Sequence, residues 1–351
     1  MLEVDLETRA GAVSVSCCFE VSSGSAVAIV GASGAGKTTV LRTIAGLVHP
    51  QRGRVACERE TWFDAQQHID VPPQKRDCAF VFAEYALFGH MSVLENVAFG
   101  LRASGYAAKS ARKKSLDVLE LIGVASIGPR LARSLSSGEA QRVAIARALA
   151  LEARVLLLDE PLSAIDVERR PPIREVLRQK IAQAGIATVL VTHEPIEAIL
   201  FSDMLIVMEA GAVVQRGSSA ELRARPLTSY VAAFTGVNLY RGVAHPLANG
   251  VSEVEVPGAR LVIVGQASGP VALVIDPDAV VLSPARPESS ARNTLHGDVA
   301  SVVPDGAAVR VSVASTPPIV ARITKQSADE LGIAPGAAVY ATFKASEVRV
   351  H

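Results

Sequence analysis

The sequence has 351 residues, of which 49% are hydrophobic, and its 35 basic side chains balance 35 acidic ones. This length allows about two domains, and the zero net charge argues against a general nucleic-acid binder. No apolar run approaches the ~20 residues of a membrane-spanning helix, and the acidic, alternating N-terminus is unlike a signal peptide. We therefore expect a protein that is made and kept in the cytosol.

The first two thirds of the chain alternate between strand and helix patterns. Alternation or short apolar runs predict strands at 2–8, 13–20, 26–30, 155–159, 187–191 and 204–209. The run at 26–30 is apolar throughout, which is typical of a strand buried on both faces of a parallel sheet. Helices are predicted at 38–46, near 166–183 and near 194–202, and across most of 92–151, with breaks near Gly105, Gly123 and Gly128-Pro129. This order predicts an α/β domain with a helical insertion at about 90–150.

Beyond residue 236 short Val-rich segments replace the long helical patterns. Segment 238–242 resembles 293–297, and 275–280 resembles 343–348, with a linker expected at 281–290. We expect two copies of a small all-β unit, each a five-stranded barrel like an oligonucleotide-binding fold, at about 236–284 and 288–351. The chain would then divide into domains at 1–235 and 236–351.

Four cysteines, Cys17, Cys18, Cys57 and Cys78, lack the spacing of a metal site. The adjacent Cys17 and Cys18 could form a strained disulfide. Reduced thiols buried on a strand are the favoured interpretation for a cytosolic protein.

A Gly-rich segment joins the predicted strand at 26–30 to the helix that follows. Residues 31–38, GASGAGKT, match G-x-x-x-x-G-K-[ST] in this context and are called the phosphate loop below. Backbone N–H groups of such a loop surround phosphate oxygens, and the helix N-terminus favours the anion. Lys37 would add charge at the β- and γ-phosphates, and Thr38 would offer a hydroxyl to Mg²⁺. The predicted ATP-binding residues are Gly31, Ser33, Gly34, Ala35, Gly36, Lys37, Thr38 and Thr39.

Two acids end the apolar strand predicted at 155–159. Asp159 is expected to hold Mg²⁺ together with Thr38, and Glu160 to act as the general base that activates the attacking water. His193 follows the next predicted core strand and can reach the γ-phosphate and position the water. The expected catalytic residues are therefore Glu160 and His193.

A second Gly turn, residues 135–142 with the sequence LSSGEAQR, precedes that strand and is called the signature segment. One chain cannot easily place both glycine turns on one nucleotide, whereas two facing chains can. The order of phosphate loop, LSSGE, LLLDEP, SAID and VTHE resembles an ATP-binding cassette ATPase over residues 1 to about 235. The resemblance implies a head-to-tail homodimer in which Ser136, Gly138 and Asp166 of one chain contact the nucleotide of the other.

The same resemblance implies partners and a location. Transmembrane permease subunits would dock near Tyr85–Met91 and Leu94–Phe99, and a substrate-binding protein would act through them. The chain would lie peripherally at the cytoplasmic face of the inner membrane.

Three departures from the family pattern bear on activity. Ala83 occupies the position of a Gln that touches Mg²⁺ and the water, and Ser137 replaces a Gly, so its Cβ would hinder close backbone approach. No aromatic residue lies near 8–12, where the family often stacks adenine. We expect nucleotide binding to survive and hydrolysis to be slow and dependent on dimerisation.

The C-terminal segments 290–299, 324–332 and 340–346 resemble the molybdate/tungstate-binding oligo-barrel domain. Such domains hold a tetrahedral dianion with N–H groups, hydroxyls and a basic side chain, so a regulatory oxyanion is a candidate ligand. The candidate residues are Ser290, Arg292, Lys344 and Ser346. The first repeat has Val237 and Asp276 at the positions of Arg292 and Lys344 and lacks these charges. Repeats that serve only in dimerisation or docking remain an equal alternative.

Cassette and tail together resemble the ATPase subunit of a molybdate importer. A sulfate, thiosulfate or ferric-ion importer ATPase is the nearest alternative, because the fold does not name a substrate. A weakly active nucleotide-binding regulator is an alternative from another class, given Ala83 and Ser137. A cassette that acts on nucleic acid is disfavoured by the net charge and the C-terminal barrels.

Overall fold

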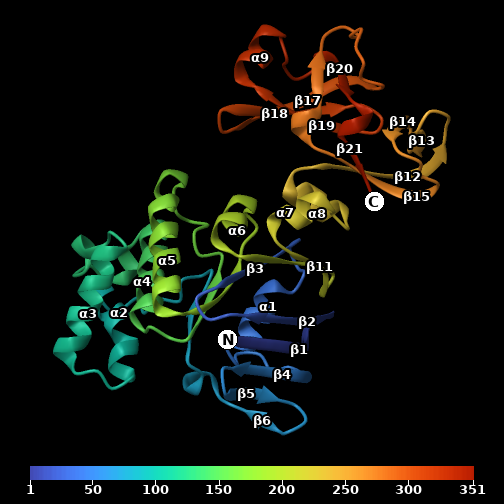
Figure 1. The fold of residues 1–351 in the computed structure, drawn as a ribbon. Coiled ribbons are helices and arrows are strands. Elements are labelled where there is room, and N and C mark those ends of the chain that lie inside the picture. The colour runs from blue at the N-terminus through green and yellow to red at the C-terminus, as the bar shows by residue number, and fades with distance from the viewer. The chain divides into compact units, whose positions relative to one another are not determined.

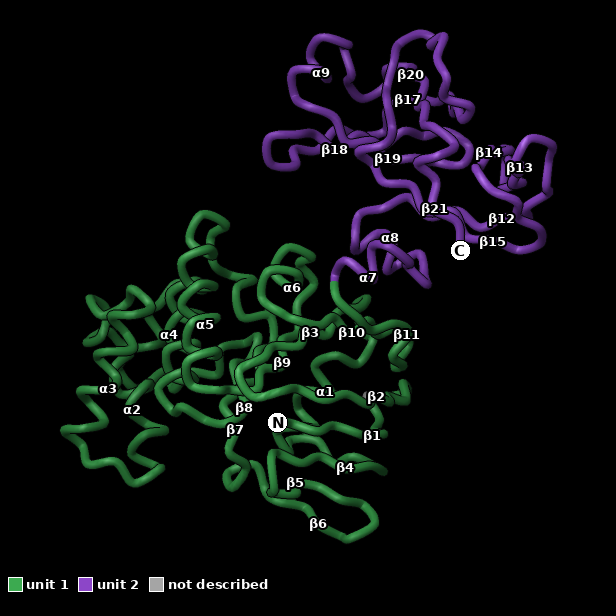
Figure 2. The backbone as a smooth tube through the Cα atoms, viewed as in Figure 1, with its two compact units in different colours: residues 1–218 green, residues 219–351 purple. Residues whose placement is uncertain are grey.

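The computed structural model describes residues 1–9 and 11–351 in full. The chain forms two compact units, residues 1–218 and residues 219–351 (Figure 2). We expected the division near residue 235, whereas the short helices α7 (Ser219–Ala224) and α8 (Ser229–Thr235) belong to the second unit. Arg223 on α7 pairs with Asp276, and Ala232 on α8 packs with Val237 and Val274.

The first unit is built on one 11-stranded sheet with the order β6-β5-β4-β1-β2-β11-β10-β3-β9-β8-β7 (Figure 1). Strands β10, β3, β9, β8 and β7 are parallel, and β6, β5, β4, β1 and β2 are antiparallel. The strands are β1 (Leu2–Ala10), β2 (Val13–Val21), β3 (Ala26–Gly31), β4 (Arg52–Cys57), β5 (Glu60–Asp64), β6 (Ile69–Asp70), β7 (Cys78–Val81), β8 (Val155–Asp159), β9 (Ala187–Val191), β10 (Met204–Glu209) and β11 (Ala212–Gly217).

Strands β3, β8 and β9 lie in the middle of the parallel part, and every one of their residues is buried. Near-continuous apolar runs are what such strands require, because helices cover both faces. All six strands predicted in this unit are confirmed. The sequence patterns missed β4 to β7 and β11. Strands β6 and β7 have only two and four residues, and β4, β5 and β11 do not alternate regularly between buried and exposed residues.

The predicted helical insertion consists of three helices that pack on one another, α2, α3 and α4 (Figure 1). Both α2 and α4 begin with a capping box, Ser92 with Glu95 and Ser136 with Glu139. No helix among the described residues is long and apolar enough to cross a bilayer. The helices of this unit are α1 (Lys37–Ile44), α2 (Val93–Ala103), α3 (Ala108–Leu121), α4 (Ser137–Ala150), α5 (Arg170–Ala184) and α6 (Pro195–Phe201).

The second unit contains two five-stranded sheets with the orders β14-β13-β12-β15-β21 and β16-β20-β17-β18-β19. Their inner faces share one hydrophobic core that includes Val254, Leu273, Val311 and Phe343. The elements are β12 (Asn238–Pro246), β13 (Val251–Val256), β14 (Ala259–Val264), β15 (Gly269–Ile275), β16 (Val281–Ser283), β17 (Asn293–Asp305), β18 (Ala308–Ala314), β19 (Ile319–Thr324), α9 (Lys325–Glu330), β20 (Ala338–Phe343) and β21 (Val348–Val350).

The two repeats exchange short strands. β16, at the end of the first repeat, pairs with β20 of the second sheet, and β21, at the end of the second repeat, pairs with β15 of the first sheet. The expectation of a linker over 281–290 was therefore wrong for its first three residues. Asn238 and Asn293, at equivalent positions, each bond both backbone groups of one residue in the other repeat, Val320 and Val262.

Candidate active site

The phosphate loop connects β3 to α1 at the carboxyl end of the parallel strands. The ammonium group of Lys37 donates to the carbonyl oxygens of Gly31 (2.8 Å) and Ala32 (3.0 Å). Gly36 has a φ of 91°, and a Cβ added there would lie 2.5 Å from Cγ2 of Val15. Only glycine fits this left-handed, closely packed position. Burial lowers the pKa of Lys37, and the nearby carboxylates of Glu160 and Asp159 oppose this shift.

Asp159 ends β8 directly opposite the first turn of α1. The Thr38 hydroxyl donates to Oδ1 of Asp159 at 3.1 Å, and Asp159 is only 4% exposed. Burial raises the pKa of this carboxyl. A hydroxyl and a carboxylate are hard oxygen donors, which are the ligands that Mg²⁺ takes together with water and phosphate oxygens. The donor set therefore fits the predicted magnesium ion.

Glu160 and His193 meet at the ends of neighbouring strands. Oε2 of Glu160 lies 2.8 Å from Nδ1 of His193, and the imidazole is 63% exposed. The backbone N–H of Glu160 donates to the carbonyl of Val191 at 2.9 Å. Glu160 has a φ of 51°, a conformation that costs a non-glycine residue about 1 kcal/mol or more. Its surroundings hold it there, which presents its carboxylate to His193.

The hydrogen bond to Glu160 raises the pKa of His193, and burial opposes the shift. The charged pair therefore stabilises the fold fully below the ordinary histidine pKa of about 6.5, and this stabilisation is lost as the pH rises through the raised value. We expect the His193 pKa to fall back toward 6.5 in a Glu160→Gln variant. Proton NMR titration of the imidazole measures this change, and an unaltered pKa in the variant would contradict the contact.

Gln141, to which the sequence assigned no role, lies fully buried on α4. Its Nε2 donates to the carbonyl of Glu160 (2.7 Å) and to Oγ of Ser163 (3.3 Å). Its Oε1 accepts from the N–H of Ala164 at 2.9 Å. One side chain thus joins α4, the helix that begins in the signature segment, to the backbone that follows β8. A polar residue on the buried face of an Ala- and Val-rich helix was the signal available in the sequence.

The signature segment lies beside the turn formed by residues 163–166, called the Asp166 turn. A groove of about 290 Å³ is lined by both, and Ser136, Gly138 and Asp166 all face it. A Cβ at Gly138 would lie 3.0 Å from the carbonyl oxygen of Ala164, whereas Ser137 is exposed in the first turn of α4. Gly138 is therefore tightly packed within this chain. Ser137 lines the same groove, and hindrance of a nucleotide by its Cβ stays a prediction.

Ala83 lies in an exposed turn that follows β7. The guanidinium of Arg147 on α4 donates to the carbonyls of Ala86 (2.7 Å) and Tyr85 (3.0 Å), both of which have positive φ angles. The turn is thus fixed to the signature helix, and the methyl group at position 83 offers no metal or water ligand.

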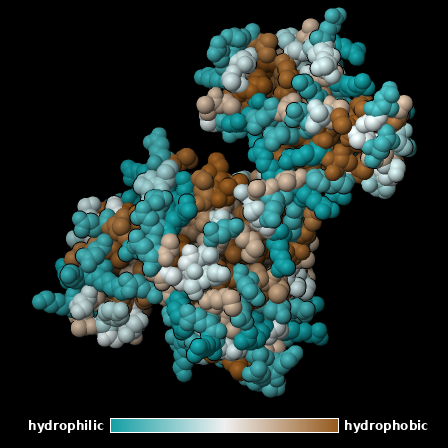
Figure 3. Space-filling view, in the orientation of Figure 1, coloured by the Kyte–Doolittle hydropathy of each residue, from teal (hydrophilic) through white to brown (hydrophobic). Residues whose placement is uncertain are grey.

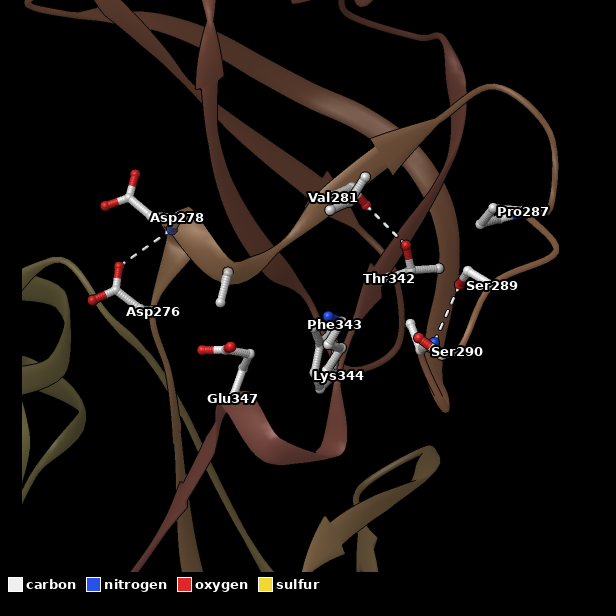
Figure 4. Close-up of a pocket in the computed structure, with 12 residues that line it drawn as sticks. Asp276, Asp278, Val281, Pro287, Ser289, Ser290, Thr342, Phe343, Lys344 and Glu347 are labelled. Atoms are coloured by element: carbon white, nitrogen blue, oxygen red, sulfur yellow. Dashed lines mark hydrogen bonds between the residues drawn. The ribbon is translucent and has the colours of Figure 1, made fainter.

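The second unit contains a cavity of about 630 Å³ (Figure 4). Of the four candidate oxyanion residues, Ser290 and Lys344 line it, while Arg292 and Ser346 are exposed outside its lining. Figure 4 shows Asp276 and Asp278 on one side, Ser289 and Ser290 on the other, and Lys344 between them. Glu347 also lines the cavity, so its lining contains three carboxylates and one lysine.

The first unit has a glycine-rich loop between the buried strand β3 and helix α1, and Asp159 and Glu160 at the end of β8, a parallel strand of the same sheet. This combination defines a P-loop ATPase. The sequence pattern of the ABC transporter family matches residues 16–163, and that of the TOBE domain matches residues 289–350.

Several known proteins are similar to this chain in sequence or in structure. The Fe(3+) ions import ATP-binding protein FbpC of Brucella abortus is 41% identical over 75% of this chain and 74% of its own length. The molybdenum import ATP-binding protein ModC of Mycobacterium tuberculosis is 36% identical over 95% and 93%. An ATP-binding cassette solved as a dimer, in a post-hydrolysis state bound to ADP and Pi, is 26% identical with a TM-score of 0.55, over 62% of this chain and 98% of the cassette. The chain belongs to the ABC transporter family and is the ATP-hydrolysing subunit of such a transporter.

Proposed function

We propose that this chain powers the import of an oxyanion, molybdate or tungstate, from the cytoplasmic face of the inner membrane. Residues 1–235 would hydrolyse ATP against transmembrane permease subunits that receive substrate from a binding protein. The observation that carries the substrate class is the repeated all-β tail, whose second copy has Lys344 and Ser290 in one cavity. The relation to ModC also extends over 95% of the chain, whereas that to FbpC covers 75%.

The geometry supports distinct roles for the residues of the active site. Lys37 and the phosphate-loop N–H groups would bind the phosphates of ATP, and Thr38 and Asp159 would hold Mg²⁺, which supplies positive charge to the leaving phosphate oxygens. Glu160 would take the proton of the attacking water. His193, whose Nδ1 lies 2.8 Å from Oε2 of Glu160, would help to orient that water. Of these groups Asp159 is buried, at 4% exposed, which strengthens its electrostatic effect.

We further propose that the ATPase acts as a homodimer. Ser136, Gly138 and Asp166 face an open groove of about 290 Å³ at the N-terminus of α4, which favours an anion from a second chain. The neighbouring α6 leaves Ile196, Ile199 and Leu200 exposed by 63%, 39% and 44%, and Figure 3 shows apolar surface there. A second copy that covers this surface would complete both nucleotide sites.

The charges around the tail cavity decide how an oxyanion could bind. Asp276 pairs with Arg223 at 2.6 Å, and Asp278 pairs with Arg322 at 3.2 Å, so these two carboxylates are compensated. Burial by itself would raise the pKa of Asp276, but the bond from Arg223 holds it below its ordinary value. Glu347 adds a further negative charge to the lining of the cavity that holds Lys344. An oxyanion bound at Lys344 would therefore be weakened by Glu347.

Two substitutions of opposite sign test the oxyanion site. We expect Lys344→Gln to weaken molybdate binding by about tenfold or more and Glu347→Gln to strengthen it, because one removes an attractive charge and the other a repulsive one. Calorimetric titration of the full-length protein with molybdate, tungstate and sulfate measures the affinities. Equal affinities in wild type and both variants would show that Lys344 and Glu347 do not face the anion.

Ferric-ion import and a regulatory role are the alternatives. Ferric import is favoured by the higher identity to FbpC, 41% against 36%. A weakly active regulator is favoured by Ala83, whose side chain cannot contact Mg²⁺ or the water. ATP turnover measured with and without permease subunits separates an importer from a regulator, and uptake of labelled molybdate against ferric ion separates the two importers.

A further inference from the structure

Arg170, the first residue of α5, lies between two loops of the catalytic region. Its Nε donates to the carbonyl of Ile165 at 2.8 Å, and its Nη2 to the carbonyl of Ser163 at 3.3 Å. Its Nη1 reaches Glu197 at 3.4 Å and Glu194 at 3.2 Å. The guanidinium, 15% exposed, thus holds the backbone of the Asp166 turn with one edge and two carboxylates with the other.

Glu197 anchors the other end of this link. It lies in the first turn of α6, is 5% exposed, and accepts from the hydroxyl of Thr192 at 3.0 Å. The same hydroxyl accepts from the N–H of Glu194 at 3.1 Å. Thr192 and Glu194 lie on either side of His193 in the chain. By holding the Thr192 hydroxyl, Glu197 fixes the backbone that carries the imidazole. Burial raises the pKa of Glu197, while the hydroxyl of Thr192 and the charge of Arg170 oppose the shift.

The Asp166 turn is held from two directions. Gln141 bonds the N–H of Ala164, and Arg170 bonds the carbonyls on either side of that residue. Each of the three residues from Ser163 to Ile165 therefore has a backbone group that is held by a side chain from α4 or α5. A planar guanidinium that forks between carbonyls and carboxylates transmits position more rigidly than a flexible ammonium group.

We propose that Arg170 and Glu197 are positioning residues that join the Asp166 turn to the loop of His193, so that contact of this turn with a second chain sets the orientation of His193 toward Glu160. The inference rests on the proposed roles of Glu160, His193 and Asp166. None of the contacts of Arg170 or Glu197 given above is to the phosphate loop. The link therefore acts on the chemical step, while Lys37 and the N–H groups of the phosphate loop still bind ATP.

Variants of the full-length protein test the link through a split between kcat and KM. We expect Arg170→Met to lower kcat by ~10–100-fold, the size of effect that follows from misplacing a catalytic group by about 1 Å, with the KM for ATP within twofold of wild type. Glu197→Gln keeps the shape and the bond to Thr192, and we expect a similar loss. Arg170→Lys restores the charge without the fork and should recover part of the rate.

The matched control is Arg178→Met, which makes the same chemical change at an exposed position two turns further along α5. We expect it to leave kcat unchanged. The double variant Arg170→Met with Glu197→Gln should lose no more than the worse single variant, because both changes break one link. Thermal unfolding identifies any variant that fails to fold, in which case Glu197→Gln and Arg170→Lys carry the test.

Several outcomes would overturn the proposal. These are a kcat in both single variants within twofold of that of Arg178→Met, losses that multiply in the double variant, or a loss that arises from KM. Failure of the underlying catalytic assignment looks different: a Glu160→Gln protein would then turn over ATP at the wild-type rate, whatever the Arg170 variants do.

Discussion

Replacement of Glu160 by glutamine is expected to lower kcat at least ~100-fold while ATP binding is retained. General bases contribute about 10²–10⁴-fold to rate, and the amide keeps the shape of the side chain but cannot take a proton. The phosphate loop and the pair of Thr38 and Asp159 stay intact, so the affinity for ATP should change little. Steady-state turnover together with calorimetric ATP binding measures both quantities.

The control for this change is Glu168→Gln, an exposed glutamate in the turn before α5. It should hydrolyse ATP at the wild-type rate. If Glu160→Gln kept more than a tenth of wild-type kcat, the base would have to be another group, and the contact between Glu160 and His193 would be a structural one.

Replacement of Gln141 by alanine is expected to destabilise the first unit by about 2–4 kcal/mol. The substitution removes the partner of the Ala164 N–H, takes one donor from the carbonyl of Glu160 and leaves a cavity at a fully buried position. Urea unfolding followed by tryptophan fluorescence reports this unit selectively, because the one tryptophan in the sequence, Trp62, is buried on β5. The kcat should also fall, since the backbone of Glu160 loses a support.

Gln183→Ala, at an exposed position on α5, serves as the control and should change stability by no more than about 0.5 kcal/mol. A loss below about 1 kcal/mol for Gln141→Ala would mean that the neighbouring backbone finds other partners. In that case Gln141 would not be the residue that fixes the catalytic strand end.

The roles of residues that belong to a local sequence motif could be predicted from the sequence. The phosphate loop and the Asp159–Glu160 pair each follow a strand, and the carboxyl ends of parallel strands meet at one edge of the sheet, so these groups had to converge. The roles of Gln141, Arg170 and Glu197 could not be predicted in this way. Gln141 bonds backbone groups 19 and 23 residues further along the chain, and Arg170 meets Glu197 27 residues away, so the tertiary fold alone brings them together.

The C-terminal unit shows the same limit in its fold. The repeat of similar segments predicted two five-stranded units, and the structure has two five-stranded sheets. The exchange of β16 and β21 was not predicted, because strands of three residues carry no pattern of alternation. Tertiary pairing with β20 and β15 defines them.

The exchange of β21 has a consequence for the order in which the protein can be completed during synthesis. The first sheet of the tail lacks one of its five strands until Val348–Val350 has left the ribosome, although the other four strands of that sheet are finished by Ile275. The first repeat therefore cannot close until Val348–Val350 has been made. Segment β21 supplies the closing strand of a unit whose first element, α7, begins at Ser219, more than a hundred residues earlier.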